Sequence, residues 1–462
     1  MPRAALLAIA VGLVLADSSV VTLALPDVYA ELDVSPSAVS WVLTAYNLVL
    51  ALASVPAALL VLRRSGRGGA APVAVAGLVV FAVASLLCAL AGSLSVLIVA
   101  RCLQGLGGAA VACAALVLLE SATGSRARGA ALWGAAGALG AAVGPAVGGL
   151  LTETLQWQSI FVLQVPIALA CLLAVRGAPA PLEEPAGLRR PDVRHLVAIG
   201  FLGAGLTAAL FLLVLLLVAG WRLSPLTAAF AVSVMPLAAL ACARLPLPPS
   251  LADVRVRGAV GAVLTGGGLA ALGLIPSASV AWTVVPQILI GIGLGLSLGP
   301  LTEAALHGRS PLVLHGGWTL TARHVGVVAA LALLTPLFTA DLEEQEQRAT
   351  ESVLARILDS PLDPRTKIDV GLKLADELNA AEGEVPEIGP AFADIAPREG
   401  EAPRLAALET RVEDELDRAA TSAFERSFLV AAALSLCALV PLLLPAGAPA
   451  APGPPHRRRA VA

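Results

Sequence analysis

Apolar blocks follow one another along most of the chain and alternate with short polar segments. Most blocks approach or exceed the length of about 20 residues that an α-helix needs to cross the hydrocarbon core of a bilayer. The pattern therefore predicts twelve membrane-spanning helices, at residues 5–25, 38–62, 71–91, 95–119, 128–151, 159–175, 195–219, 225–244, 258–276, 281–303, 316–339 and 426–444. Residues 1–16 have the character of a signal peptide, but the apolar run continues to Leu25, so we expect a retained first helix.

Composition supports this membrane assignment. Hydrophobic residues make up 58% of the 462 positions and charged residues 14%, against about 45–50% and about 25% in soluble globular domains. The six cysteines lie in apolar stretches, so neither a disulfide framework nor a metal cluster is indicated. The sequence also lacks a phosphate-binding loop ending in Gly-Lys-Ser or Gly-Lys-Thr. We expect no enzyme activity, no cofactor, no metal and no nucleic-acid partner.

The arginines predict the orientation of the spans. Under the twelve-span topology they gather on one side, which the positive-inside rule makes cytoplasmic. They are Arg63, Arg64, Arg67, Arg126, Arg128, Arg176, Arg189, Arg190, Arg194, Arg244, Arg255, Arg257, Arg309, Arg457, Arg458 and Arg459. The opposite short loops carry Asp27, Glu31, Asp33 and Glu153, with Arg222 as their basic residue. We expect a multi-pass protein of the cell (inner) membrane, embedded in its lipid bilayer, with both termini cytoplasmic.

The predicted spans divide into two sets of six, separated by a Pro-, Gly- and charge-rich connection. This division predicts an all-α polytopic membrane protein with six segments. They are residues 1–176, a six-helix bundle; 177–193, a cytoplasmic linker; 194–340, spans seven to eleven; 341–425, an extracytoplasmic insertion; 426–445, span twelve; and 446–462, a cytoplasmic tail.

The insertion at residues 341–425 contains most of the acidic residues of the chain. Two apolar stripes at helical spacing run through it. One comprises Leu405, Leu408, Val412, Leu416 and Ala419, and the other comprises Val353, Leu354, Ile357 and Leu358. We predict a small helical cap outside the membrane, and a solvated spacer of helices and loops remains an equal alternative.

Two charged residues fall inside predicted spans. Asp17 lies about halfway through the first span, where an ionised carboxylate costs roughly 2.5–3.5 kcal/mol on insertion scales. Because burial favours the protonated form of a carboxyl group, Asp17 is our candidate proton site. Arg101 lies in the fourth span with Gln104 three residues later on the same helix face. We expect Arg101 to pair with Asp17, and a purely structural role for Asp17 remains the alternative.

The fifth predicted span is rich in glycine. Small residues recur there at spacings of three and four, with one proline among them: Gly134, Gly137, Gly140, Gly144, Pro145, Gly148 and Gly149. Glycine lets two helices approach closely, and proline bends a helix. The spacing alone predicts tight packing, and we assign Gly140, Gly144, Pro145, Gly148 and Gly149 to helix packing and gating.

Several runs resemble motifs of the drug:proton antiporters of the major facilitator superfamily, in their twelve-helix form. The run Asp17-Ser-Ser-Val-Val-Thr-Leu-Ala-Leu-Pro26 is similar to their first-helix motif, Trp41-Val-Leu-Thr-Ala-Tyr46 to the start of their second helix, and Arg101-Cys-Leu-Gln-Gly105 to their fourth-helix motif. Gly140 to Gly149 resembles their fifth-helix antiporter motif, and Thr321-Ala-Arg323-His-Val-Gly326 a second-half segment. The resemblance implies two six-helix bundles, alternating access and export in exchange for protons.

The chain also departs from that pattern. Leu59 and Arg63 stand where the loop after the second helix usually has Gly and Asp, and this leaves Arg64, Gly66 and Arg67 of the usual gate motif. The insertion lies outside the resemblance. A transporter-like scaffold or sensor that binds an envelope partner through the insertion therefore remains an alternative, as does a metabolite uniporter.

Few residues are candidates for contact with a substrate. Aromatic residues make up only 4% of the chain, so we expect a cavity of small aliphatic side chains that favours apolar or amphipathic molecules. We assign Trp41, Tyr46, Gln104 and Arg323 to it. Arg323 is a buried charge of the eleventh predicted span, for which interhelical packing is an equal alternative.

Overall fold

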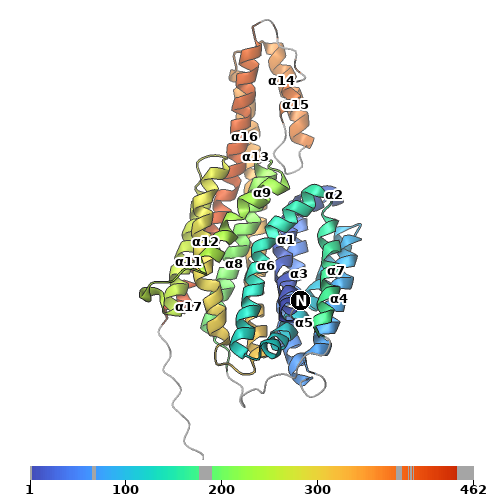
Figure 1. Ribbon diagram of the computed structural model, residues 1–462. Coiled ribbons are helices and arrows are strands. Elements are labelled where there is room, and N and C mark those ends of the chain that lie inside the picture. Colours follow the sequence, from blue (N-terminus) through green and yellow to red (C-terminus); the bar gives the residue numbers. More distant parts are fainter. Residues whose placement is uncertain are drawn as a thin grey trace, which may run out of the picture.

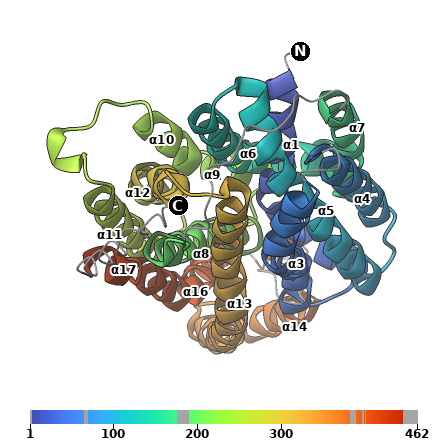
Figure 2. The same cartoon turned by 90° about the horizontal axis from the view of Figure 1, so that it is seen from below.

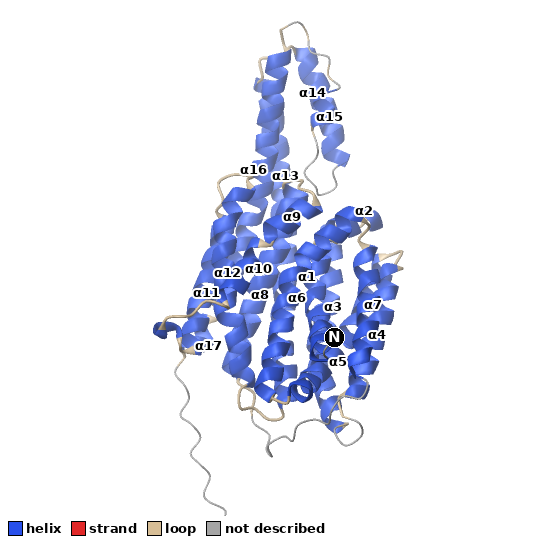
Figure 3. Cartoon of the chain, viewed as in Figure 1, coloured by secondary structure: helices blue, strands red, loops and turns tan. Residues whose placement is uncertain are grey.

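The computed structural model describes residues 3–64, 69–175, 190–380, 388–393, 395, 398 and 400–444. Over these ranges it is helical, with no strand (Figure 3). Twelve of the described helical stretches are long and apolar enough to cross a membrane. The predicted all-α class and the twelve predicted spans are therefore confirmed.

The first six spans come from seven helices. They are α1 (Arg3–Thr22), α2 (Leu25–Leu32), α3 (Pro36–Arg63), α4 (Ala71–Ala89), α5 (Leu94–Thr123), α6 (Arg126–Thr154) and α7 (Gln158–Val175). Serine side chains at positions 35, 93 and 125 accept backbone N–H groups where α3, α5 and α6 begin, which satisfies donors that a helix start leaves free. Gly124, with φ of 63°, ends α5 in the left-handed conformation that glycine adopts without strain.

The second half is less regular. Its elements are α8 (Val193–Leu215), the π-helical turn η1 (Leu216–Gly220), α9 (Pro225–Val232), α10 (Val234–Cys242), η2 (Pro249–Leu251), α11 (Val254–Gly273), α12 (Val280–Leu306), α13 (Leu312–Asp359), α14 (Pro364–Ala380), α15 (Gly389–Ala393), α16 (Ala402–Leu436) and α17 (Leu439–Leu443). The predicted span 225–244 is broken at Ser233, between α9 and α10. Pro236 explains the break, because it has no N–H to donate to Val232.

The helices form two groups side by side, α1–α7 and α8–α17, with a tall helical projection at one end (Figure 1). We call the end with the projection the insertion end and the opposite end the linker end. Seen from the linker end, α13 lies beside α3 of the other group (Figure 2). A Cβ atom on Gly317 of α13 would lie 3.0 Å from the Ser54 carbonyl of α3. The backbones of α3 and α13 therefore come close together at this point.

The projection contains the predicted insertion, residues 341–425, and its outer helices are continuous with the neighbouring spans. α13 continues without a break past residue 339 to Asp359, and α16 begins at Ala402 and enters the last span as one helix. A separate apolar core joins these helices with α14 and α15 and contains Val353, Ile357, Leu362, Val370, Leu374, Phe392, Leu405, Leu408, Val412 and Leu416. The first stripe is thus buried as expected, whereas Leu354 and Leu358 of the second are exposed.

At the linker end, Asp192 joins the start of α8 to the turn before α13. Its Oδ2 atom lies 2.9 Å from Arg309 Nη2 and 3.0 Å from His195 Nδ1, and Arg309 Nη1 donates to the Arg190 carbonyl at 2.8 Å. The neighbouring His195, and then Arg309, lower the pKa of Asp192 from 3.8 to about 2. The remainder of the predicted linker, residues 177–189, lies outside the described residues.

We predict that Asp192→Asn lowers stability by on the order of 1–2 kcal/mol at pH 7. Because the pKa of Asp192 is depressed in the folded protein, the ionised carboxylate stabilises the fold above about pH 4, and this contribution disappears as the pH falls to about 2. Thermal denaturation of both proteins in detergent between pH 7 and pH 2.5 measures the difference. A difference as large at pH 2.5 as at pH 7 would contradict this assignment.

Candidate functional site

An ion pair is buried inside the first helix group. Asp17 of α1 and Arg101 of α5 both have fully buried side chains, and Asp17 Oδ2 lies 2.5 Å from Arg101 Nη1. Within the described part of the chain, Asp17 Oδ2 accepts no aligned hydrogen bond and Arg101 Nη2 donates none. The Oδ2–Nη1 contact is therefore an ion pair without an aligned hydrogen bond.

Three uncharged side chains close a polar ring around this pair. Arg101 Nη1 donates to Gln104 Oε1 at 2.5 Å, and Gln104 Nε2 donates to Gln164 Oε1 of α7 at 2.6 Å. Gln164 Nε2 in turn donates to Asp17 Oδ1 at 2.8 Å. Ser85 of α4 accepts from Gln104 Nε2 at 2.9 Å. Four helices therefore contribute to one network in which both charges are held by hydrogen bonds, as buried charges require.

Tyr46 of α3 completes the surroundings of Arg101. The guanidinium carbon lies 4.3 Å from the centre of the Tyr46 ring, a cation–π distance. The Tyr46 hydroxyl donates to the Val14 carbonyl at 2.7 Å, and Arg101 Nε donates to the Val42 carbonyl at 3.0 Å. The guanidinium is thus held by α3 as well as by Asp17.

A second polar cluster connects the two helix groups. Asn47 of α3 donates to Ser18 Oγ of α1 at 2.9 Å, and its Oδ1 atom lies 2.8 Å from His324 Nδ1 of α13. Thr321, one turn earlier on α13, donates to the Ala51 carbonyl at 2.8 Å. Any rotation of one group against the other near α3 and α13 must break these contacts.

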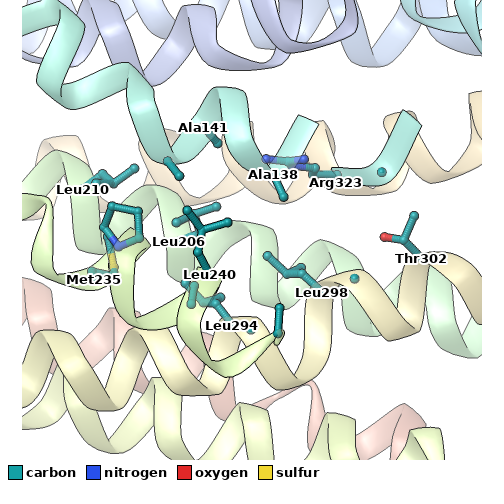
Figure 4. Close-up of a pocket in the computed structure, with 17 residues that line it drawn as sticks. Ala138, Ala141, Leu206, Leu210, Met235, Leu240, Leu294, Leu298, Thr302 and Arg323 are labelled. Carbon is teal, nitrogen blue, oxygen red and sulfur yellow. The ribbon is translucent and has the colours of Figure 1, made fainter. Parts of the chain in front are cut away.

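A cavity of about 170 Å³ lies between the groups, enclosed by α6 on one side and by α8, α10, α12 and α13 on the other. Its wall is mainly aliphatic (Figure 4), and Thr302 and Arg323 supply its polar side chains. Arg323 also borders a smaller cavity of about 40 Å³ that contains Ser18, Asn47 and His324 in its wall. The charged pair Asp17–Arg101 lines neither cavity directly.

The glycines of α6 lie against both helix groups. A Cβ atom on Gly140, Gly144 or Gly148 would come closer than 3.0 Å to atoms of α1, and one on Gly149 would meet Ala229 and Pro225 of α9. Pro145 is buried between these glycines. Backbone contact of this kind is open only to glycine. The α6 helix therefore packs on α1 along its length and on α9 at the insertion end.

The predicted site residues lie in different parts of the structure. Tyr46 and Gln104 belong to the charged network, and Arg323 lines the cavities. Trp41 is 53% exposed on the outside of α3, so we leave it out of the proposed site. Arg64 caps α3, and Gly66 and Arg67 lie outside the described residues.

Sequence reasoning missed three residues of the two networks, Ser85, Asn47 and Gln164, and it gave His324 no role in the site. Each is a polar residue within an apolar span, so a search for such residues would have found them. Ser85, Asn47 and Gln164 lie outside the runs that resemble the family motifs, and they belong to no glycine or charge pattern. Their partners lie on other helices and are visible only in the fold.

Two groups of six spans, a charged network inside one group and an apolar cavity between them define a polytopic membrane protein of the transporter type. Over residues 7–330 the chain matches the family model described as Major Facilitator Superfamily. The chain therefore belongs to the Major Facilitator Superfamily, as the motifs predicted, and the family places it among transporters rather than enzymes.

Curated relatives with partial matches carry names of efflux and resistance proteins. The drug efflux pump JefA of Mycobacterium tuberculosis is 35% identical over 184 residues, which are 38% of this chain and 35% of the relative. The methylenomycin A resistance protein of Bacillus subtilis is 32% identical over 238 residues, 50% of this chain and 48% of the relative. The chain thus spans about half or less of the length of these relatives.

Solved structures show the same fold over nearly the whole chain. A bacterial homolog of the human lysosomal transporter Spinster, in an inward-facing and occupied conformation, superposes with a TM-score of 0.63 at 16% identity. The match covers 95% of this chain and 97% of the other. At this identity the likeness supports the fold alone.

Proposed function

We propose that the chain is a secondary active transporter that exports small apolar or amphipathic molecules in exchange for protons by alternating access. The observation that carries the proposal is the fully buried Asp17–Arg101 pair, with its Oδ2–Nη1 distance of 2.5 Å. Ionisable residues inside membrane spans are costly, and those in transporters often belong to proton relays. In this proposal the linker and both termini are cytoplasmic and the membrane is the cell (inner) membrane.

The mechanism assigns one task to each part of the site. Asp17 binds a proton from outside and releases it inside, while Arg101 remains charged and attracts the ionised form of Asp17. Substrate occupies the cavity between the helix groups. The two groups rock about the cavity, and the α6–α9 and α3–α13 contacts, which join one group to the other, are the surfaces that separate or slide.

The names of the relatives support export as the direction of transport. Both compared relatives are named for drug efflux or antibiotic resistance, and the aliphatic wall of the cavity suits apolar molecules. Because the chain covers only part of their lengths, their substrates are not transferred to it.

Proteoliposomes loaded with a pH-sensitive dye test this proposal. When a transported compound is added to one side, an antiporter moves protons in the opposite direction, so the internal pH changes with the compound and not without it. A panel of apolar and amphipathic compounds that moves through the protein without any pH change would instead identify a uniporter. No movement of any compound and no pH change would contradict transport itself.

A second candidate function rests on the insertion. Leu354, Leu358, Ile368 and Leu372 are 48%, 70%, 60% and 63% exposed on α13 and α14, within the predicted insertion. Exposed leucine and isoleucine side chains of this kind suit a partner in the cell envelope. Under this alternative, Leu358→Glu has the same effect on cells as deletion of the gene, but it leaves transport in proteoliposomes unchanged. Loss of transport in Leu358→Glu would contradict it.

A further inference from the structure

Arg323 presents a charge to the cavity between the helix groups. The residue lies on α13 and lines both the 170 Å³ cavity and the smaller one beside it. Figure 4 shows its side chain at one side of the larger cavity, beside Ala138 of α6 and across from the aliphatic residues of α10 and α12. The side-chain stem packs near Gly203 of α8, where a Cβ atom would be 3.4 Å from Arg323 Cγ. The guanidinium group therefore extends beyond this contact.

No carboxylate in the described part of the chain pairs with this charge. Among the described residues, neither a hydrogen bond nor an ion pair reaches the Arg323 guanidinium, and none of the residues that line the two cavities is acidic. Arg101 of the same chain is a direct contrast, because it contacts the Asp17 carboxylate, the Gln104 amide oxygen and the Val42 carbonyl. The Arg323 side chain is only half-buried, but the cavity wall around it is mainly aliphatic, and a charge in such surroundings is normally paired. The Arg323 guanidinium is therefore free to bind an anion that is not part of the protein.

The other residues that line the larger cavity indicate the chemistry of the rest of that partner. It contains Gly, Ala, Leu, Met and Pro side chains, with Thr302 as its one hydroxyl among the described lining residues, and it has no aromatic side chain. Such a wall buries an apolar body by shape and supplies few hydrogen bonds. A guanidinium binds a carboxylate through two parallel hydrogen bonds, which a single amine or hydroxyl group cannot reproduce.

We propose that this cavity binds a small amphipathic anion, with its carboxylate on Arg323 and its aliphatic body against α10 and α12. As the substrate class of the exporter, the inference rests on the transport function proposed above. It narrows that function, since apolar neutral molecules and organic cations lack the group that Arg323 requires, and an organic cation is repelled by it.

Three probes with one aliphatic body and different head groups test the inference: octanoate, octan-1-ol and octylamine. Their binding to the full-length protein in lipid nanodiscs is measured by isothermal titration calorimetry, with empty nanodiscs subtracted for lipid partition. The wild-type protein is expected to bind octanoate at least about tenfold more tightly than the other two, a difference of about 1.4 kcal/mol. Equal affinities in the wild type would overturn the proposal without any variant.

Variants then assign the preference to Arg323. Arg323→Gln should remove the preference for octanoate and leave the affinity for octan-1-ol within about twofold, whereas Arg323→Lys should keep part of it. The control Arg411→Gln removes an exposed arginine of the insertion and should leave all three affinities unchanged. A role of Arg323 in helix packing alone predicts instead that Arg323→Gln affects the three probes equally, and that result would overturn the proposal.

The binding assay separates this inference from the proposed function, because it needs no proton gradient. Anion binding through Arg323 in a protein that moves no protons would leave the cavity assignment standing and overturn the antiport mechanism. Proton-coupled transport of neutral or cationic compounds, without a preference for octanoate, would leave antiport standing and overturn the anion site.

Discussion

Asp17→Asn is expected to reduce substrate-driven proton movement in proteoliposomes to the level of protein-free liposomes. Asparagine has nearly the shape of aspartate and can still accept from Gln164 Nε2, which lies 2.8 Å from Asp17 Oδ1, but it has no ionisable proton. Exchange of labelled for unlabelled substrate needs no net proton transfer, so it should continue in this variant. Proton movement within twofold of the wild-type rate would contradict the role of Asp17.

Asp17→Asn is also expected to lower the stability of the protein, and this effect must be separated from the loss of proton movement. Removal of one partner of a buried ion pair leaves the other charge unpaired and costs about 3–5 kcal/mol. Asp17→Asn should therefore also lower thermal stability, since Arg101 is fully buried. The double variant Asp17→Asn/Arg101→Gln removes both charges, so stability should recover while proton movement stays at background. Recovery of proton movement in the double variant would indicate that misfolding, not loss of the proton site, had caused the defect.

The sequence was sufficient to predict the spans and the charged pair, for physical reasons that differ. Span length follows from bilayer thickness, so an apolar block is enough to place each helix. Asp17 and Arg101 stand out because charge inside a span is costly, and opposite charges satisfy each other. The pairing needed no knowledge of helix rotation, because each charge had only the other as a strong partner within the first six spans.

Other features depended on helix rotation and on helix continuity, which composition does not determine. Trp41 and Tyr46 are five positions apart on α3, yet Trp41 faces outward while Tyr46 lies under Arg101. The eleventh span is predicted to end at residue 339, but the helix itself continues through the acidic residues that follow and ends at Asp359. Arg323 could be recognised as a buried charge from sequence, whereas its lack of an acidic neighbour appears only in the fold.

The last prediction concerns close packing of α1 against α6. Gly140→Ala is expected to destabilise the protein by about 1–3 kcal/mol or more, because overpacking forces the backbone to shift. The added methyl group would fall closer than 3.0 Å to the carbonyl oxygen of Gly12 on α1, and a backbone atom in the middle of a helix cannot turn aside. The midpoint of thermal denaturation in detergent should therefore fall, and transport should fall with it.

Gly134→Ala on the same helix is the matched control. No atom outside its own helix neighbourhood lies within 4 Å of a Cβ atom at Gly134, so the methyl group adds no clash, and alanine favours a helix over glycine by up to about 1 kcal/mol. The two substitutions make the same chemical change and should shift stability in opposite directions. The α1 backbone lies against Gly140 but not against Gly134. If the Gly140→Ala protein were as stable as the Gly134→Ala protein, α1 and α6 would not be in backbone contact. Gly148→Ala, which meets the Val20 carbonyl in the same way, should repeat the loss and thereby extend the contact along the length of α6.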